Sequence, residues 1–238
     1  MRLNKFISDS GVCSRREADS WISAGRVTIN GQVASLGTQV SATDDVCVDG
    51  KSLGAKPRDV YIVLNKPVGV TCTSEPHIPG NIVAFVGYPE RVFPIGRLDK
   101  DSEGLILLTN NGDIVNEVLR AEHAHEKEYV VTVDKPVTDT FLKSLASGVR
   151  ILGTITRPCE TKRLAPNAFG ITLTQGLNRQ IRRMCAAFGY RVRRLQRIRI
   201  MHIRLGSLRR GQWRELTAAE ERVLLDQCAL HQSAAPVR

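Results

Sequence analysis

The feature that most constrains the fold of this chain is the irregular order of its predicted helices and strands. Apolar residues recur at helical spacing in residues 3–7 and 18–22, and the later helices and strands alternate without a repeating βαβ unit. Regularly wound parallel sheets are built from that repeat. The sequence therefore predicts an α+β fold with a mixed, largely antiparallel main sheet.

Residues 1–56 are predicted to form a small α/β module. Ser14 and Glu17 make a capping-box pair at the start of its second helix. Short strands are expected at 27–29 and 46–48, each followed by a tight turn of the Asn-Gly or Asp-Gly type. A polar stretch after this module predicts a linker.

The remainder is predicted to form one larger domain, residues 60–228, and a frayed tail, residues 229–238. Thr138 or Asp139 is expected to open one of its helices, and Gly189 to end another. Strands are expected at 60–64, 93–96, 104–109, 128–133, 169–173, 192–195 and 198–205, and helices at 113–120, 138–147 and 179–188.

Positive charge is concentrated in one part of the chain. The formal net charge is +10, and residues 157–215 hold 15 basic and only 2 acidic side chains. Almost all of these basic residues are arginines, which bind phosphate through a planar fork of donors, so the cluster is typical of a nucleic-acid surface. The alternative is a solvated basic face without a partner, which is disfavoured because so few acidic residues interrupt the run.

Composition also bears on the compartment. No apolar run reaches the ~18 residues of a transmembrane helix, and the N-terminal residues are too polar to open a signal peptide. We therefore expect a cytoplasmic protein with no membrane partner.

The six cysteines are scattered and are expected to be reduced thiols. Only His123 and His125 lie close together, so no metal site is expected.

Residues 96–113 carry a candidate catalytic carboxylate. Asp99 lies in a predicted turn before an apolar strand, between Arg97 and Lys100. Neighbouring cations hold such a carboxylate ionised, so that it can act as a nucleophile or a base. Taken alone the pattern is weak, because aspartates in turns usually form local hydrogen bonds.

Two further segments offer an aromatic and a cationic group. Tyr129 enters a predicted strand, where it is either a core residue or a platform on which an extruded base stacks. On the predicted helix at 179–188, Arg179 shares a face with Arg182 and Arg183. One of these arginines is expected to pair with Asp99, and the others to meet phosphate.

With these segments the chain resembles the RsuA/RluB/RluE/RluF family of pseudouridine synthases. The resemblance rests on GRLDKDSEGL at 96–105 and NRQIRRM at 178–184, and it extends from Arg2 to about Leu225. The continuation through FGY at 188–190 and RIM at 199–201 is most similar to the large-subunit type F branch. The N-terminal module resembles the RNA-binding domain of ribosomal protein S-four, with CSRREAD at 13–19 and the Asn30-Gly31 pair.

The resemblance implies a role for five residues. Asp99 is similar to the essential aspartate of the family, and Arg182 to the basic residue that pairs with it. Tyr129 matches the tyrosine that stacks beneath the target uracil, and Arg97 the arginine that fills the RNA helix after base flipping. Leu195 matches an apolar residue that lines the pocket.

The same resemblance implies a cofactor-independent isomerase acting on a uridine in large-subunit (23S) rRNA, with a tRNA loop left open as a second substrate. Asp99 would either attack the anomeric carbon or remove a sugar proton, and both routes need an ionised carboxylate in a site that excludes water. A monomer is the default expectation. The remaining expected RNA contacts are Lys66, Lys127, Arg179, Arg183, Asn4, Lys5, Ser14, Arg15, Arg16 and Asn30.

Two rival functions were weighed. A non-catalytic RNA-binding ribosome-assembly factor would use the same basic surface, but it has no use for an aspartate among phosphate contacts. A nucleic-acid hydrolase would need a metal cage or a second carboxylate. Glu75, Asp101 and Glu103 are available, and the last two are interpreted as a turn residue and a helix-end cap.

Overall fold

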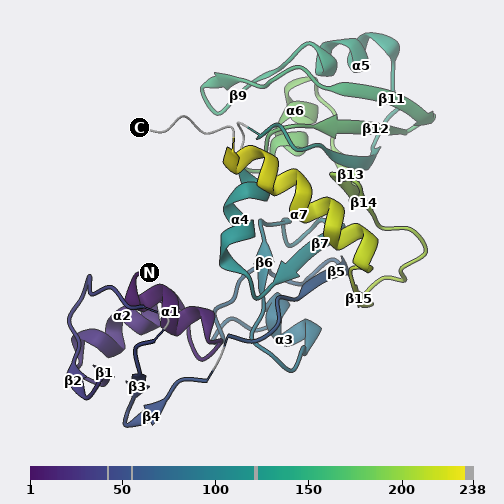
Figure 1. The fold of residues 1–238 in the computed structure, drawn as a ribbon. Helices are drawn as coiled ribbons and strands as arrows, with labels where there is room; N and C mark the ends of the chain where they lie inside the picture. The colour runs from purple at the N-terminus through teal and green to yellow at the C-terminus, as the bar shows by residue number, and fades with distance from the viewer. Residues whose placement is uncertain (42, 55, 121–122, 234–238) are drawn as a thin grey trace. The chain divides into compact units, whose positions relative to one another are not determined.

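The computed structural model describes residues 1–41, 43–54, 56–120 and 123–233, the last five of these by backbone only, and forms two compact units (Figure 1). The first unit takes two short segments from later in the chain, so no single cut along the sequence describes it. It contains Met1–Val60, Tyr88–Val92 and Asn110–Gly112, and the second unit contains Tyr61–Gly87, Phe93–Thr109 and Asp113–Arg238.

The first unit combines two helices, α1 (Leu3–Asp9) and α2 (Arg15–Ser23), with a four-stranded antiparallel sheet. The predicted capping box at α2 is confirmed, since Glu17 N donates to Ser14 Oγ at 3.2 Å and Ser14 N donates to Glu17 Oε2 at 3.0 Å. Asn30 and Asp49 both have φ of 50°, as the predicted tight turns require. The strands, in the order β2-β1-β3-β4, are Gln32–Val33, Val27–Ile29, Val46–Val48 and Lys51–Ser52.

The second unit is built on a mixed sheet in which almost every pairing is antiparallel, which confirms the predicted fold class. Its main path runs β11-β12-β8-β13-β7-β5-β15, with β14 paired to β13 and β6 to β7. These strands are β5 (Tyr61–Lys66), β6 (Phe93–Ile95), β7 (Glu103–Thr109), β8 (Lys127–Val133), β11 (Glu160–Ala165), β12 (Ala168–Leu173), β13 (Val192–Ile200), β14 (Ile203–Arg204) and β15 (Trp213–Glu215).

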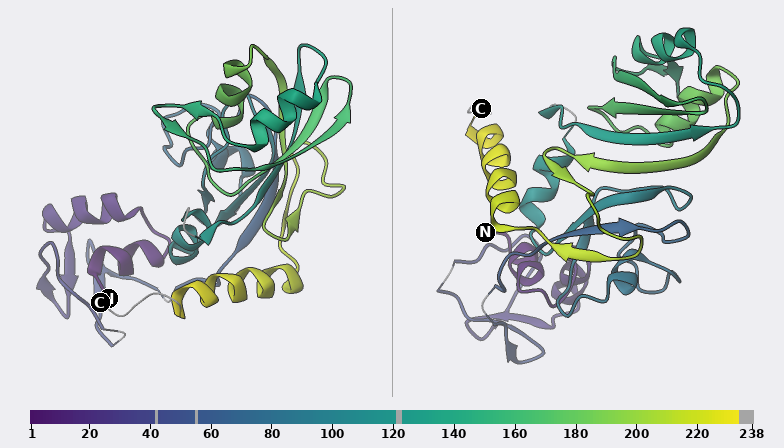
Figure 2. Two further views of the ribbon diagram at one scale, coloured as in Figure 1. Left: turned by 90° about the horizontal axis from the view of Figure 1, so that it is seen from above. Right: turned by 90° about the vertical axis from the view of Figure 1, so that its right-hand side faces the viewer.

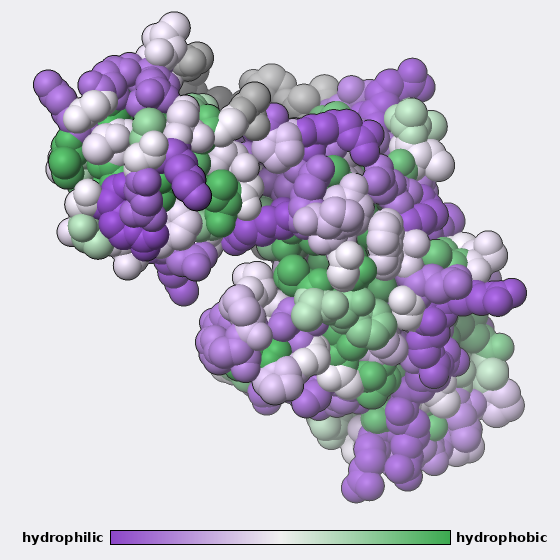
Figure 3. Space-filling view, turned by 90° about the horizontal axis from the view of Figure 1, so that it is seen from below, coloured by the Kyte–Doolittle hydropathy of each residue, from purple (hydrophilic) through white to green (hydrophobic). Residues whose placement is uncertain are grey.

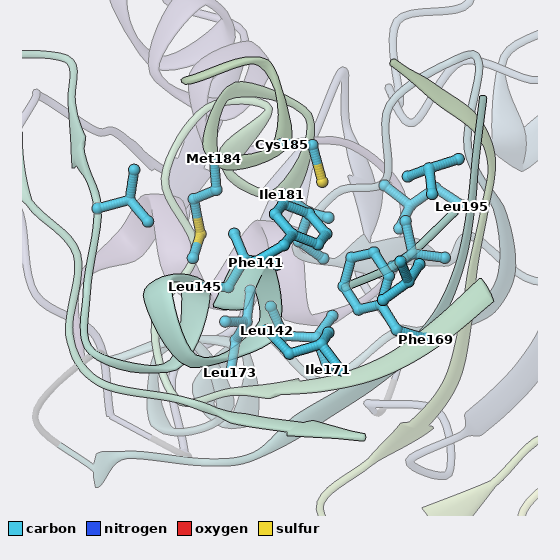
Figure 4. Close-up of a cluster of buried hydrophobic side chains, with 14 of the residues drawn as sticks. Phe141, Leu142, Leu145, Phe169, Ile171, Leu173, Ile181, Met184, Cys185 and Leu195 are labelled. Atoms are coloured by element: carbon cyan, nitrogen blue, oxygen red, sulfur yellow. The ribbon is translucent and has the colours of Figure 1, made fainter. Parts of the chain in front are cut away.

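The helices of this unit divide between the two halves of the sheet (Figures 1 and 2). α5 (Asp139–Ala146) and α6 (Gln180–Ala187) pack with β8, β12 and β13 around a core of buried side chains, among them Phe141, Phe169 and Met184 (Figure 4). α4 (Gly112–Leu119) and α7 (Ala218–Ser233) pack on β5 and β7 in a second core. A short helix, α3 (Ile82–Val86), and a small hairpin, β9 (Arg150–Ile151) with β10 (Thr154–Ile155), complete the unit.

The two halves of the sheet join where β13 pairs with β7, the one parallel pairing among the described strands. Arg197 lies opposite Gly104 at this junction. A Cβ atom on Gly104 would lie 2.2 Å from the carbonyl oxygen of Arg197, and the φ of this glycine is +102°. Only glycine allows the two strands to approach so closely.

Several predicted boundaries hold and others do not. Thr138 caps α5 by accepting a hydrogen bond from Phe141 N at 3.1 Å, and Gly189, with φ of +72°, follows the last turn of α6. α7 continues to Ser233, inside the segment expected to be a frayed tail, and residues 234–238 lie outside the described residues. Eight elements were not expected from the sequence, namely α3, α7, β2, β4, β9, β10, β11 and β15.

Within the described residues no helix is long and apolar enough to cross a membrane. Hydrophilic residues predominate on the face drawn in Figure 3, with apolar residues in smaller groups among them. None of the six cysteines forms a disulfide, and four of them are buried.

Candidate active site

Asp99 lies on the loop between β6 and β7, which neighbouring backbone groups hold in place. Leu98 N donates to the Cys72 sulfur at 3.4 Å, and Gly69 N donates to Lys100 O at 2.8 Å. Ser102 N closes the turn by donating to Asp99 O at 3.0 Å. The loop is therefore fixed before any substrate binds, as a catalytic carboxylate requires.

This loop forms one wall of a cavity of about 500 Å³ in the second unit. The side chains around the cavity come from the β6–β7 loop, from β8 and β13, and from the segment that leads into α6. Residues expected from the sequence to form the site gather here, namely Arg97, Asp99, Lys127, Tyr129, Arg179 and Leu195.

The cation beside Asp99 is one of the three arginines expected from the helix pattern, but not the one that the resemblance implied. Arg179 Nη1 lies 3.8 Å from Asp99 Oδ2, whereas the ion-pair partner of Arg182 is Asp101, at 3.4 Å. The pairing of Arg182 with Asp99 that the resemblance implied is therefore wrong in this structure. The Asp99 side chain is also 29% exposed, so the carboxylate is only partly shielded from water.

Arg179 occupies an unusual backbone position. It is the N-cap of α6 and has φ of 50°, in the left-handed region that non-glycine residues rarely adopt. Its guanidinium makes two hydrogen bonds to the Asp101 carboxylate, at 3.1 and 3.0 Å. These bonds lower the pKa of Asp101 despite the opposing effect of burial, and they turn Arg179 toward the cavity.

Arg182 acts on the loop rather than on the carboxylate of Asp99. Its Nη2 donates to the backbone oxygen of Asp101 at 2.8 Å and to Ser102 Oγ at 3.2 Å. The side chain is 14% exposed and lies between α6 and the loop. Arg182 is thus a positioning residue for the segment that carries Asp99. Arg183, expected to meet phosphate, is exposed and donates to Asn178 O and Oδ1.

Lys127 and Tyr129 are two residues apart on β8, so their side chains lie on the same face of the strand, and both line the cavity. Tyr129 is half-buried and pairs with Arg197 across the sheet, and Leu195 is 6% exposed on the neighbouring strand. Burial lowers the pKa of Lys127 to about 8, with a smaller effect from the charge of Arg197. The cavity therefore combines an aromatic platform with a lysine that titrates near neutral pH.

Lys66 was expected to contact RNA, and the structure corrects that expectation. Its side chain is fully buried, and Nζ donates to the backbone oxygens of Pro67 and Val70, both at 2.9 Å. Desolvation lowers the pKa of this ammonium group. Lys66 stabilises the turn after β5 and is closed off from a bound RNA.

The residues of the N-terminal unit that were expected to bind RNA differ in exposure. Arg15 and Arg16 are exposed on α2, and Asn4, Lys5 and Ser14 are half-buried. Asn4 donates to Asp19, and Ser14 serves as the cap of α2. Asn30 is exposed in its turn and donates to Asp44 Oδ1 at 3.0 Å.

The carboxylates that a hydrolase would need are otherwise engaged. Glu103 is not a helix-end cap as expected; it begins β7, is buried, and pairs with Arg194 and Arg210. Asp101 pairs with Arg179, and Glu75 is exposed beside His77. Among the described residues no group of three or more His, Cys, Asp or Glu side chains is placed to hold a metal ion.

The sequence analysis missed Arg197 as a residue of the site. It lines the same cavity and is 4% exposed, yet in the sequence it is one of many arginines between residues 179 and 214. Arg197 follows Leu195 by two residues on β13, with no irregularity between them, so alternation places both on the cavity face. The expected strands, 192–195 and 198–205, left Arg197 in the gap between them.

Comparison with known proteins identifies the class. The family model "RNA pseudouridylate synthase" matches residues 60–187, and the "S4 domain" model matches residues 1–51. The chain therefore belongs to the RNA pseudouridine synthase family, and it carries an N-terminal S4 domain. It is an isomerase that acts on RNA.

Individual relatives agree with the type F resemblance. "Dual-specificity RNA pseudouridine synthase RluF" of Salmonella typhi is 57% identical over 221 residues, which cover 92% of this chain and 76% of that protein. "Ribosomal large subunit pseudouridine synthase B" of Bacillus subtilis (strain 168) is 36% identical, covering 92% and 93% of the two chains. A solved structure, "Crystal structure of pseudouridylate synthase", is 32% identical with a TM-score of 0.69 and covers 94% of this chain and 99% of that one.

Proposed function

We propose that this synthase converts a uridine of 23S rRNA to pseudouridine at the cavity that contains Asp99, and that it also accepts a structurally similar tRNA loop. The observation that carries the proposal is the meeting of Asp99, Arg179 and Tyr129 in one cavity large enough for an unstacked pyrimidine. The dual-specificity name of the Salmonella relative supports the second RNA substrate.

In this proposal Asp99 is the catalytic carboxylate, and Arg179 is the cation beside it, with Nη1 3.8 Å from Asp99 Oδ2. Tyr129 stacks on the extruded base, a contact that contributes on the order of 1–3 kcal/mol. Arg97, exposed at the cavity, enters the gap that the base leaves in the RNA. Together these contacts offset the few kcal/mol that base flipping costs.

We also propose that the two parts of the chain have different roles. Residues 1–56 bind RNA through the exposed arginines of α2, and residues 60–228 carry the reaction. In the same proposal the protein acts as a monomer in the cytoplasm. No cofactor is part of the proposal.

The substrate is tested by mapping pseudouridine in 23S rRNA and tRNA from cells with and without this protein. Deletion is expected to remove one rRNA pseudouridine and to lower one tRNA pseudouridine, and a plasmid copy is expected to restore both. An unchanged rRNA map would contradict the 23S assignment. An unchanged tRNA map would limit the substrate to rRNA.

A further inference from the structure

Arg197 is a buried arginine that has no carboxylate partner in the part of the chain that the structure describes. Its Nε donates to the Leu105 backbone oxygen at 2.7 Å, but neither terminal nitrogen makes a hydrogen bond within the described part of the chain, and Nη2 is fully buried. A guanidinium stays protonated at any ordinary pH. An unpaired charge in this position costs several kcal/mol, so its presence calls for a physical reason.

Two nearby arginines on the same strand form ion pairs with carboxylates. Arg194 pairs with Glu103, and Arg199 pairs with Glu126 at 2.9 Å and Glu128 at 2.8 Å. Among the described residues no such ion pair is made by Arg197. Arg193 also makes no ion pair among the described residues, but it is exposed to solvent. Arg197 is therefore the buried arginine of this strand that lines the cavity without a carboxylate partner among those residues.

The positive charge of Arg197 acts on the cavity. Its Cζ lies over the Tyr129 ring, 6.0 Å from the ring centre. The same charge contributes to the lowered pKa values of Lys127 and Lys66. Around the cavity the described lining includes four basic residues and a single acidic one, Asp99.

The reaction creates a transient negative charge in this place. When the bond between C1′ and N1 breaks, its electron pair stays on the base, and uracil is released as an anion with charge shared by N1, O2 and O4. Carbon-5 then bonds to C1′, the hydrogen on carbon-5 leaves as a proton, and N1 takes up one proton, so the product is a neutral isomer of the substrate. No atom or electron is gained or lost overall, so the detached uracil anion is the species that needs a cation.

We propose that Arg197 is a catalytic residue that binds a carbonyl oxygen of the flipped uracil through its terminal nitrogens and stabilises the detached uracil anion. This inference rests on the proposed site at Asp99. A preorganised donor in a water-poor pocket is most effective where charge develops during the reaction. An RNA phosphate is the less favoured anion, because Arg97 and Arg179 are exposed at the same cavity whereas Arg197 is buried.

The test compares two substrates under single-turnover conditions, with loss of the N-glycosidic bond as the readout. One RNA carries uridine at the target position and the other 5-fluorouridine, whose fluorine stabilises the N1 anion. Arg197→Met is expected to slow the uridine reaction by about 100-fold or more, and the 5-fluorouridine reaction by at least about tenfold less than that. The RNA dissociation constant is expected to change by less than about threefold.

Conservative and control variants accompany this comparison. Arg197→Lys keeps a charge and is expected to recover part of the uridine rate, which Arg197→Met lacks. Arg199→Met removes a partly buried arginine from the same strand outside the cavity, and it is expected to keep the wild-type rate within about threefold. Asp99→Asn is expected to be inactive on both RNAs, so activity in that variant would refute the proposed site independently of Arg197.

Three outcomes overturn the inference. Equal rate losses on both RNAs show that Arg197 does not respond to the stability of the leaving base. A weakened dissociation constant that accounts for the rate loss assigns Arg197 to phosphate instead. A wild-type uridine rate in Arg197→Met removes the residue from the reaction.

Discussion

At the scale of single residues, the sequence predicted which residues form the site better than it predicted how they pair. Asp99, Tyr129 and Leu195 were expected in the cavity and lie there. The resemblance implied Arg182 as the partner of Asp99, but Arg179, another of the three arginines left open by the helix pattern, lies beside it and has a left-handed backbone. A single strained φ value cannot be read from residue spacing, which is why the pairing was mispredicted.

Lys127 gives a prediction that depends on pH. Its pKa is lowered from 10.5 to about 8, so the unfolded chain binds the proton more tightly and the charged lysine destabilises the folded state. Lys127→Met should therefore raise the free energy of unfolding at pH 7 by about 1–3 kcal/mol. The gain should shrink as the pH rises above about 8 and vanish beyond the pKa of the unfolded lysine, near 10.5.

Urea denaturation at pH 7 and pH 9.5 measures this difference. Lys143→Met, at an exposed position on α5, is the matched control and should change stability little at either pH. A gain for Lys127→Met that stays constant between the two pH values would contradict the burial of its charge.

At the scale of helices and strands, periodicity identified the elements that bury a regular face and missed those that do not. β7 is an unbroken buried run and α5 has an amphipathic face, and both were predicted. β11 is almost entirely exposed at the sheet edge, so its sequence has no alternation to detect. In α7 the buried positions Leu224 and Cys228 form only a narrow stripe.

The junction of β7 and β13 gives the prediction at this scale. Gly104→Ala adds a methyl group that overlaps the Arg197 backbone and strains a φ of +102°, so it should destabilise the protein by at least about 3 kcal/mol. Gly153→Ala shares the positive φ, at +76°, but meets no atom within 4 Å, and it should cost only about 1 kcal/mol. Denaturant unfolding of both variants measures their loss in free energy of unfolding. The difference between the two losses gives the cost of the steric overlap, because both variants share the backbone strain of a positive φ. Similar losses would show that the close approach at Gly104 is unimportant.

At the scale of the whole molecule, charge and motif together predicted an RNA-modifying enzyme. The +10 net charge and the arginine-rich stretch indicated an RNA partner but not a reaction. The motif around Asp99 supplied the reaction, and the family match confirmed it. The sequence could not show that Arg197 is buried and makes no ion pair among the described residues, because this depends on the close packing of β7 and β13 at Gly104.

The most direct test of the account is the pseudouridine yield of Asp99→Asn on its RNA substrate, measured together with RNA affinity. The variant keeps the shape of the side chain and removes its charge, so it should fold, bind RNA within about threefold of wild type, and form pseudouridine at least about a thousandfold more slowly. Asp101→Asn, on the same loop, should retain measurable turnover. Wild-type product formation by Asp99→Asn would contradict the claim that this carboxylate carries the reaction.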